Sequence, residues 1–145
     1  LFLFFLATLL AVVSSKKNQK LVYIAHDTNP RRYWVADPDH PSLIRLDQAK
    51  STKWLVTKSG DSNRISPYGR DSGLSVTYKG YDDFVNLKKT TSGQKWSFIP
   101  HHSRKVAIQS DEEPSQYLNS KLYTNNYPHL ATDTESEPQW ILIPV

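Results

Sequence analysis

The sequence predicts an all-β protein made of three similar units of about 40 residues, and two regularly spaced landmarks carry this prediction. The first is a tryptophan in a β-prone run, which recurs at intervals of 42 and 44 residues: Trp54, Trp96 and Trp140. The second is an isoleucine at intervals of 41 and 43 residues: Ile24, Ile65 and Ile108. A large apolar residue follows each isoleucine nine positions later: Tyr33, Leu74 and Tyr117. Units of this length must pack on their copies, because they cannot bury their own apolar faces.

Short strand-like runs and turn clusters alternate along the chain. The first unit has runs at residues 21–24, 33–35, 43–46 and 54–56. The second has them at residues 63–65, 74–76, 84–87 and 96–99, and the third at residues 105–108, 116–118, 129–131 and 139–142. Clusters of Gly, Pro, Asn, Asp, Ser, Thr and Glu separate the runs at residues 27–30, 37–39, 59–61, 71–73, 90–93, 112–114 and 125–126. Strands with turns about every 8 to 12 residues indicate a sandwich or a barrel.

The N-terminal segment has the composition of a secretory signal. The first thirteen residues are apolar except for Thr8, and small and basic residues follow them. We therefore expect residues 1–15 to be a signal peptide that lacks its N-terminal part, with Lys16 as the first residue of the mature chain. A membrane anchor is the alternative, although thirteen residues fall short of the roughly 20 that span a bilayer. The expected product is a secreted domain over residues 16–145 with no membrane contact after cleavage.

Composition excludes several classes of protein. The chain has no cysteine, which excludes disulfides, zinc sites built on thiolates and thiol catalysis, so the fold depends on its core alone. The net charge is only +4, from 18 Lys and Arg against 14 Asp and Glu. The basic residues are scattered, without the run of five or more that is typical of nucleic-acid-binding tails. We expect no nucleic-acid partner and no cofactor.

The repeated motifs resemble those of the ricin B-like (R-type lectin) family. Residues 22–26, 64–66 and 106–109 match its Tyr-x-Ile-x-Asn strand, and residues 33–35, 74–76 and 117–119 match its Tyr-Leu-Asp-Val strand. The terminal Gln-x-Trp motif is intact at residues 94–96 and degenerate at residues 52–54 and 138–140. The resemblance implies a β-trefoil, in which three four-stranded repeats (roughly residues 20–60, 61–103 and 104–145) are related by pseudo-threefold symmetry. It also implies carbohydrate binding.

The four tryptophans are expected to have two roles. A buried tryptophan removes on the order of 200 Å² from water. We therefore place Trp54, Trp96 and Trp140 in the core, near the threefold axis. Trp34 has no aromatic counterpart in the other repeats, where Ser75 and Leu118 stand, so we expect it to face solvent or a ligand.

No catalytic constellation is found in the sequence. Neighbouring residues of a strand point to opposite faces. If His101 with His102, and Asp82 with Asp83, lie on strands, neither is a pair suited to metal binding or acid–base hydrolysis. We expect the protein not to be an enzyme and to hold no metal.

Two stretches have the composition of a sugar site. A sugar needs an aromatic platform for its ring face, and amide or carboxylate groups for its hydroxyls. The expected carbohydrate-binding residues are Tyr78, Tyr81, Asp82, Asp83 and Asn86 in the second repeat, and Asn119, Tyr123, Asn125, Asn126 and Tyr127 in the third. The first repeat offers Asp37, Asp39 and His40. The partners would be glycans or glycoproteins, bound at more than one repeat so that weak sites add through multivalency.

The sequence departs from the family at one position. R-type lectins carry a sugar-binding aspartate in their second strand, and here the matching positions are Trp34 or Val35, Ser75 or Val76, and Leu118 or Asn119. None of these residues is acidic, and Asn119 is the polar substitute.

Other interpretations remain open from the sequence. The tyrosine-rich stretches also suit simple turns with tyrosines packed over a hairpin. A trefoil can bind proteins instead, as a protease inhibitor or a cytokine-like ligand, and residues 37–41 form a loop with two prolines that suits an inhibitor. A third interpretation is binding of acidic polysaccharides through Lys88, Lys89, Lys95, Arg104 and Lys105.

Overall fold

The computed structural model describes residues 18–69, 73–89, 92–123 and 127–145, and these residues form twelve strands and no helix. The strands are β1(Gln19–His26), β2(Arg32–Ala36), β3(Ile44–Asp47), β4(Trp54–Ser59), β5(Ser62–Pro67), β6(Ser75–Thr77), β7(Asn86–Lys88), β8(Trp96–Pro100), β9(Val106–Ser110), β10(Tyr117–Leu122), β11(Pro128–Asp133) and β12(Trp140–Pro144). The all-β prediction is confirmed. In these residues no helix has the length and apolarity to cross a membrane.

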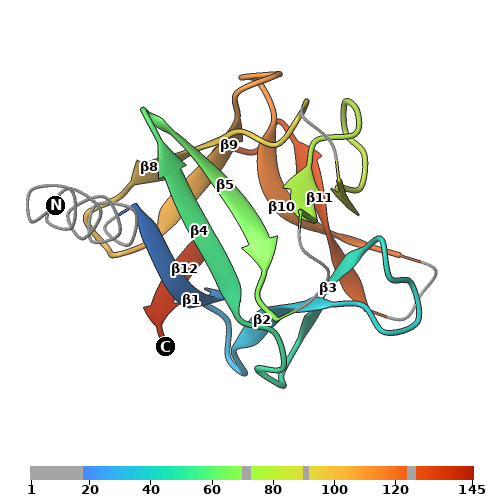
Figure 1. Ribbon diagram of the computed structural model, residues 1–145. Coiled ribbons are helices and arrows are strands. Elements are labelled where there is room, and N and C mark those ends of the chain that lie inside the picture. The colour runs from blue at the N-terminus through green and yellow to red at the C-terminus, as the bar shows by residue number, and fades with distance from the viewer. Residues whose placement is uncertain (1–17, 70–72, 90–91, 124–126) are drawn as a thin grey trace, which may run out of the picture.

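Six of the strands close into a ring. β1 pairs with β4, β4 with β5, β5 with β8, β8 with β9, β9 with β12, and β12 again with β1, all antiparallel. A closed ring leaves no unpaired strand edge, which suits a protein without disulfides. Figure 1 shows the ring strands, and the C-terminus lies beside β1 and β12.

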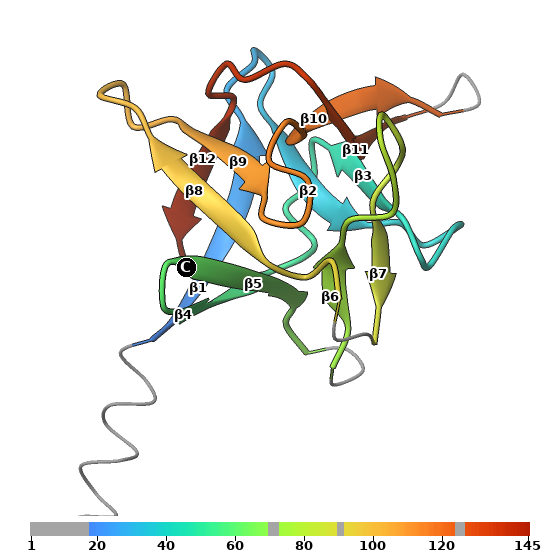
Figure 2. The ribbon, with the colours of Figure 1, turned by 90° about the horizontal axis from the view of Figure 1, so that it is seen from above.

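The other six strands form three hairpins, β2–β3, β6–β7 and β10–β11. The hairpins contact one another. β3 pairs with β11 at Arg45 and His129; the Val85 N–H donates to the Leu130 carbonyl at 3.2 Å, and the Leu87 N–H to the Ser42 carbonyl at 2.9 Å. In Figure 2, β6 and β7 lie on the same side of the ring as β3 and β11. The hairpins therefore gather at one side of the ring.

The two sequence landmarks meet in the core. All six of their residues are fully buried: Ile24, Ile65, Ile108, Trp54, Trp96 and Trp140. Each lies on a ring strand, and each of these three indoles donates its Nε1–H to a main-chain carbonyl of a hairpin strand. Trp54 bonds Trp34 at 2.9 Å, Trp96 bonds Val76 at 2.9 Å, and Trp140 bonds Leu118 at 2.8 Å. The prediction that these tryptophans form the core is confirmed.

The indole hydrogen bonds also correct the sequence register. They make Trp34, Val76 and Leu118 equivalent, whereas the nine-residue spacing from the isoleucines aligns Leu74 with Tyr33 and Tyr117. The second repeat holds one more residue than the others between its isoleucine and this position. A turn absorbs one additional residue easily, whereas the core position stays the same.

The prediction that Trp34 faces solvent or a ligand is wrong. Its side chain is 0% exposed. Its ring meets Trp54 and Trp140 edge to face, with centroids 5.9 and 5.2 Å apart. The residues that accept the other two indole hydrogen bonds, Val76 and Leu118, are also buried although they are smaller.

Candidate functional site

The hairpin β2–β3 presents a charged pair to the surface. Residues of a strand alternate between its two faces, so Ile44 and Leu46 enter the core while Arg45 and Asp47 share the outer face. The Arg45 guanidinium donates to the Asp47 carboxylate at 2.9 Å. It also lies 3.8 Å from Asp37 and 3.9 Å from Asp39. Arg45 is therefore held in place from several sides, although its Nε–H has no partner among the described residues.

Tyr127 of the third repeat joins this pair. The β3–β11 pairing brings the start of β11 beside Arg45, and the guanidinium carbon lies 4.4 Å from the centre of the Tyr127 ring. A cation over a ring face at this distance is attracted by the electron-rich π system. Tyr127 is still 43% exposed, so much of it stays open to a ligand.

A buried acid–base pair, Asp37 and His129, holds the residues around Arg45 and Tyr127 in place. The Asp37 carboxylate lies 2.6 Å from His129 Nε2, and both side chains are almost fully buried. His129 Nδ1 lies 2.8 Å from the Tyr127 carbonyl. Both partners offer acceptor oxygens, so each of these contacts is a hydrogen bond when the ring nitrogen that makes it carries a hydrogen. Asp37 also accepts the backbone N–H groups of Asp39 and His40, which holds the β2–β3 loop.

These contacts shift the titration of Asp37. Burial alone would raise the pKa of its carboxyl, but the hydrogen bonds from His129, Asp39 and His40 and the charge of His129 together lower it. The unfolded chain therefore binds the proton more tightly than the folded chain does. Stability from this group is present above the ordinary value of 3.8 and is lost as the pH falls through the lower folded pKa.

We expect the free energy of unfolding to fall more steeply with acid in the wild type than in Asp37→Asn. Urea unfolding at intervals between pH 6 and pH 2 measures this. Asp61→Asn, which changes an exposed carboxylate, is the control. Its free energy of unfolding should change with pH as that of the wild type does. Equal slopes for Asp37→Asn and the wild type would contradict the assignment.

Two surface clefts adjoin the Arg45–Asp47 pair. The Tyr68 cleft has a volume of about 300 Å³ and is lined by Val35, Ala36, Pro38, Arg45, Ser51, Thr52 and Tyr68. Tyr68 is 56% exposed, so its ring is available as a platform. Thr52 accepts the Ala36 N–H at 3.1 Å, which ties the segment before β4 to β2.

The Tyr127 cleft adjoins Asp47 of the pair and has a volume of about 230 Å³. Its lining residues are Arg32, Leu46, Asp47, Gln48 and Tyr127. It combines an aromatic ring with a carboxylate, an amide and a guanidinium. Each cleft thus offers one exposed tyrosine and several groups that donate or accept hydrogen bonds.

The predicted third-repeat stretch is only partly at this surface. Tyr123 is half-buried, with its ring centroid 5.2 Å from His40, 5.3 Å from Phe84 and 5.0 Å from His129. It packs the hairpins together, over a small cavity of about 50 Å³. Tyr127 lines a cleft, as described above. Asn125 and Asn126 lie outside the described residues.

Asn119 is the expected polar substitute for the aspartate of R-type lectins. It follows Leu118, as Val35 follows Trp34 and Thr77 follows Val76. It is 4% exposed, and its amide nitrogen donates to the Glu135 carbonyl at 2.9 Å and to the Asp133 carboxylate. These bonds tie β10 to the end of β11 and leave little of Asn119 open to a sugar.

The predicted second-repeat stretch forms an ordered loop beside β10 and β11. Tyr78 is half-buried against the core, and burial raises the pKa of its hydroxyl, helped by the neighbouring charges of Glu113 and Glu112. Asn86 is buried and pairs with Thr77 in the β6–β7 hairpin. Tyr78 and Asn86 are therefore part of the packed structure rather than of an open binding surface.

The acidic residues of that loop, Asp82 and Asp83, also have partners within the protein. The Asp82 N–H donates to Gln116 Oε1 at 2.8 Å, and Gln116 Nε2 donates to Asp82 Oδ1 at 3.2 Å. Asp83 lies 3.9 Å from Lys79. Tyr81 is 60% exposed and lines none of the clefts described here. The loop meets the third repeat through the contact between Phe84 and Tyr123.

Sequence reasoning missed Arg45, Asp47, Gln48 and Tyr68. Alternation along residues 44–47 signals that Arg45 and Asp47 share the outer face of a strand. Nothing in the sequence places Tyr68 beside Arg45, because Arg45 belongs to the first repeat and Tyr68 follows β5 in the second. Within the described residues, no group of three His, Asp or Glu side chains is close enough to hold a metal ion.

No protein-family model matches the chain, and no curated protein matches its sequence. Its fold does match solved structures. The lysenin pore superposes with a TM-score of 0.68 at 16% identity, over 87% of this chain and 46% of the lysenin chain. Lysenin in complex with phosphocholine superposes with a TM-score of 0.67 at 17% identity, over 87% and 44% of the two chains.

Two further structures extend the comparison. A GlcNAcα1-4Gal-releasing endo-β-galactosidase from Clostridium perfringens has a TM-score of 0.68 at 14% identity, over 86% of this chain and 32% of the enzyme chain. The Haemophilus ducreyi cytolethal distending toxin has a TM-score of 0.62 at 14% identity, over 88% of this chain and 84% of the other. This chain spans less than half of the lysenin and galactosidase chains. The likeness shows a shared fold alone.

Proposed function

We propose that this chain is a secreted, non-enzymatic, carbohydrate-binding β-trefoil that holds neutral glycans in the Tyr68 and Tyr127 clefts. The observation that carries the proposal is the pair of exposed tyrosines whose clefts adjoin a fixed Arg45–Asp47 pair. Glycans or glycoproteins would be its partners.

The trefoil symmetry is supported by three sets of equivalent features. The closed ring takes two strands from each sequence repeat, and each repeat adds one hairpin. The same indole hydrogen bond occurs once in each repeat. We infer that three copies of one unit are arranged around a common axis, as the resemblance implies.

The clefts suit a sugar chemically. A pyranose presents C–H groups on one face, which favour the electron-rich face of a tyrosine, and hydroxyls at its rim, which both donate and accept. Around Tyr68, donors and acceptors come from Arg45, Ser51 and the main chain. Around Tyr127 they come from Asp47, Gln48 and Arg32. Ion pairing restrains Arg45 and Asp47 before a ligand arrives, which lowers the entropy lost on binding.

This site differs from that of an R-type lectin. Trp34 and Val35 are the two candidates for the position of the family's aspartate, and Val35 lines the Tyr68 cleft as an apolar residue. The polar contacts would therefore come from β3 and from the segment before β4. The sequence-predicted residues Tyr78, Tyr81, Asp82 and Asp83 remain predictions for a separate weak site.

A glycan array followed by binding isotherms tests the proposal. The array selects a neutral glycan, and titrations compare the wild type with Tyr68→Ala and Tyr127→Ala. At least one of these two variants is expected to weaken binding about tenfold, the effect of losing one central aromatic contact. Leu122→Ala is the control, because it truncates an exposed apolar side chain that lines neither cleft, and it should leave binding unchanged. Tyr81→Ala probes the separate weak site.

Several results would overturn the proposal. The first is that the protein binds no neutral glycan. The second is that only Tyr81→Ala abolishes binding, and the third is that the protein binds phosphocholine but no glycan. Nanomolar inhibition of a serine, cysteine or aspartic protease without glycan binding would favour the inhibitor interpretation, for which the restrained loop at residues 37–41 is suited. Binding to heparin that salt abolishes would indicate an acidic polysaccharide instead.

A further inference from the structure

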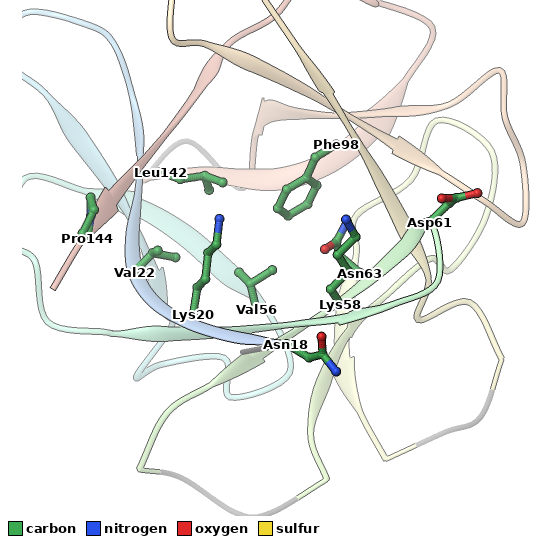
Figure 3. A pocket seen from close by; sticks show the side chains of 10 residues that line it. All are labelled: Asn18, Lys20, Val22, Val56, Lys58, Asp61, Asn63, Phe98, Leu142 and Pro144. Atoms are coloured by element: carbon green, nitrogen blue, oxygen red, sulfur yellow. The ribbon is translucent and has the colours of Figure 1, made fainter. Parts of the chain in front are cut away.

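A separate cavity opens at the end of the ring opposite to the hairpins. Its volume is about 390 Å³, within the range of small-molecule sites. Its walls come from β1, β4, β5, β8 and β12, at the end of the ring where β1 begins and β12 ends. Figure 3 shows its lining side chains. We call it the barrel-mouth cavity.

The cavity follows from the alternation of the ring strands. Inward positions recur every second residue, so the core residues Ile24, Trp54, Trp96 and Trp140 are continued outward by Val22, Val56, Phe98 and Leu142. These four residues line the cavity. Val22 and Val56 are buried, and Phe98 and Leu142 pack partly exposed against the core. They form an apolar floor.

One inward position is polar and helps to keep the mouth open. Two residues before the landmark isoleucines stand Val22, Asn63 and Val106. Asn63 lines the cavity, and its side-chain amide donates to the Trp96 carbonyl at 3.3 Å. An amide held at the wall does not fill the mouth as a packed apolar side chain would.

The next inward positions are lysines on two strands. Lys20 continues from Val22 in β1, and Lys58 continues from Val56 in β4. Both line the cavity, and Figure 3 shows Lys20 extending into it from β1. Among the described residues, none of the ion pairs includes Lys20 or Lys58. Asp61 is the acidic residue among the lining side chains. The rim therefore carries two unpaired cations over an apolar floor.

We propose that the barrel-mouth cavity binds a small amphipathic anion, such as the anion of a medium-chain fatty acid. The apolar tail would lie on Val22, Val56, Phe98 and Leu142, and the anionic head would lie between Lys20 and Lys58. The charge of the rim selects against a neutral or cationic head. This site is independent of the glycan clefts, which lie at the hairpins.

Titration with a chain-length series tests the site. The chain from residue 16 onward contains every described strand, and it is titrated with hexanoate, octanoate and decanoate by calorimetry. Affinity should rise about fourfold for each methylene that enters the cavity. Chemical shifts of the Val22, Val56 and Leu142 methyl groups should change in an NMR titration. Changes confined to other residues would overturn the proposal.

Charge variants test the rim without disturbing the core. The double variant Lys20→Gln with Lys58→Gln should weaken octanoate binding about fivefold, as expected for exposed ion pairs, and leave octanol binding unchanged. The matched control is Lys53→Gln with Lys88→Gln, two exposed lysines away from the cavity, which should bind octanoate as the wild type does. The absence of octanoate binding, or octanol binding as tight as octanoate binding, would contradict the proposal.

Discussion

Replacing Trp140 with alanine is expected to lower the free energy of unfolding by about 3–5 kcal/mol. The side chain is fully buried, its ring lies 5.2 Å from that of Trp34 and 5.4 Å from that of His26, and its Nε1–H satisfies the Leu118 carbonyl. The substitution removes a large apolar surface, leaves a cavity and deprives a buried acceptor of its donor.

The other repeats provide the comparison for this prediction. Trp54→Ala and Trp96→Ala remove the same buried indole and the same kind of hydrogen bond, so their losses should be of similar size. Urea unfolding followed by circular dichroism measures all three. Tyr81→Ala, on the surface, should change stability by less than about 0.5 kcal/mol. A loss below about 1 kcal/mol for any of the three tryptophans would contradict a shared core.

Asp37→Ala is expected to cost about 3–5 kcal/mol at neutral pH, because it leaves the buried His129 without its carboxylate partner. It also removes the acceptor of the Asp39 and His40 N–H groups. The β3–β11 contact depends on this pair, so the Tyr127 cleft should lose its shape along with the stability.

A double-mutant cycle isolates the interaction. His129→Ala alone should also destabilise, and the double variant should lose much less than the two single losses combined, since neither group is then left unpaired. Arg31→Gln breaks an exposed ion pair with Asp27 and should change stability by less than about 1 kcal/mol. Additive losses for Asp37 and His129 would contradict the buried pair.

The core could be predicted from the sequence because its positions repeat. The tryptophans at the start of β4, β8 and β12 and the isoleucines of β1, β5 and β9 are all fully buried, and the same residue types recur there at a nearly fixed spacing. The burial of Trp34 could not be predicted in this way. Its neighbours Trp54 and Trp140 come from two different repeats, and a spacing pattern does not show which residue fills the space between them.

The site could be predicted only in part, for a similar reason. The cluster of tyrosine and asparagine in one hairpin predicted Tyr127, which lines one of the clefts. Its partner Arg45 lies in another repeat, and only the β3–β11 pairing shows the contact. Composition also selected Asn86 and Asn119, which suit a sugar chemically, but the fold uses both as buried hydrogen-bonding or pairing residues. A residue type indicates possible chemistry, whereas exposure depends on tertiary packing.

The most direct test of carbohydrate binding at the hairpins is an NMR titration of the ¹⁵N-labelled chain with a neutral glycan chosen from the array. We predict that the largest amide shift changes occur at residues 35–38, 45–48, 51–52, 68 and 127, around the two clefts. Changes confined to residues 78–86, changes confined to the barrel-mouth cavity, or the absence of any saturable change would contradict the account.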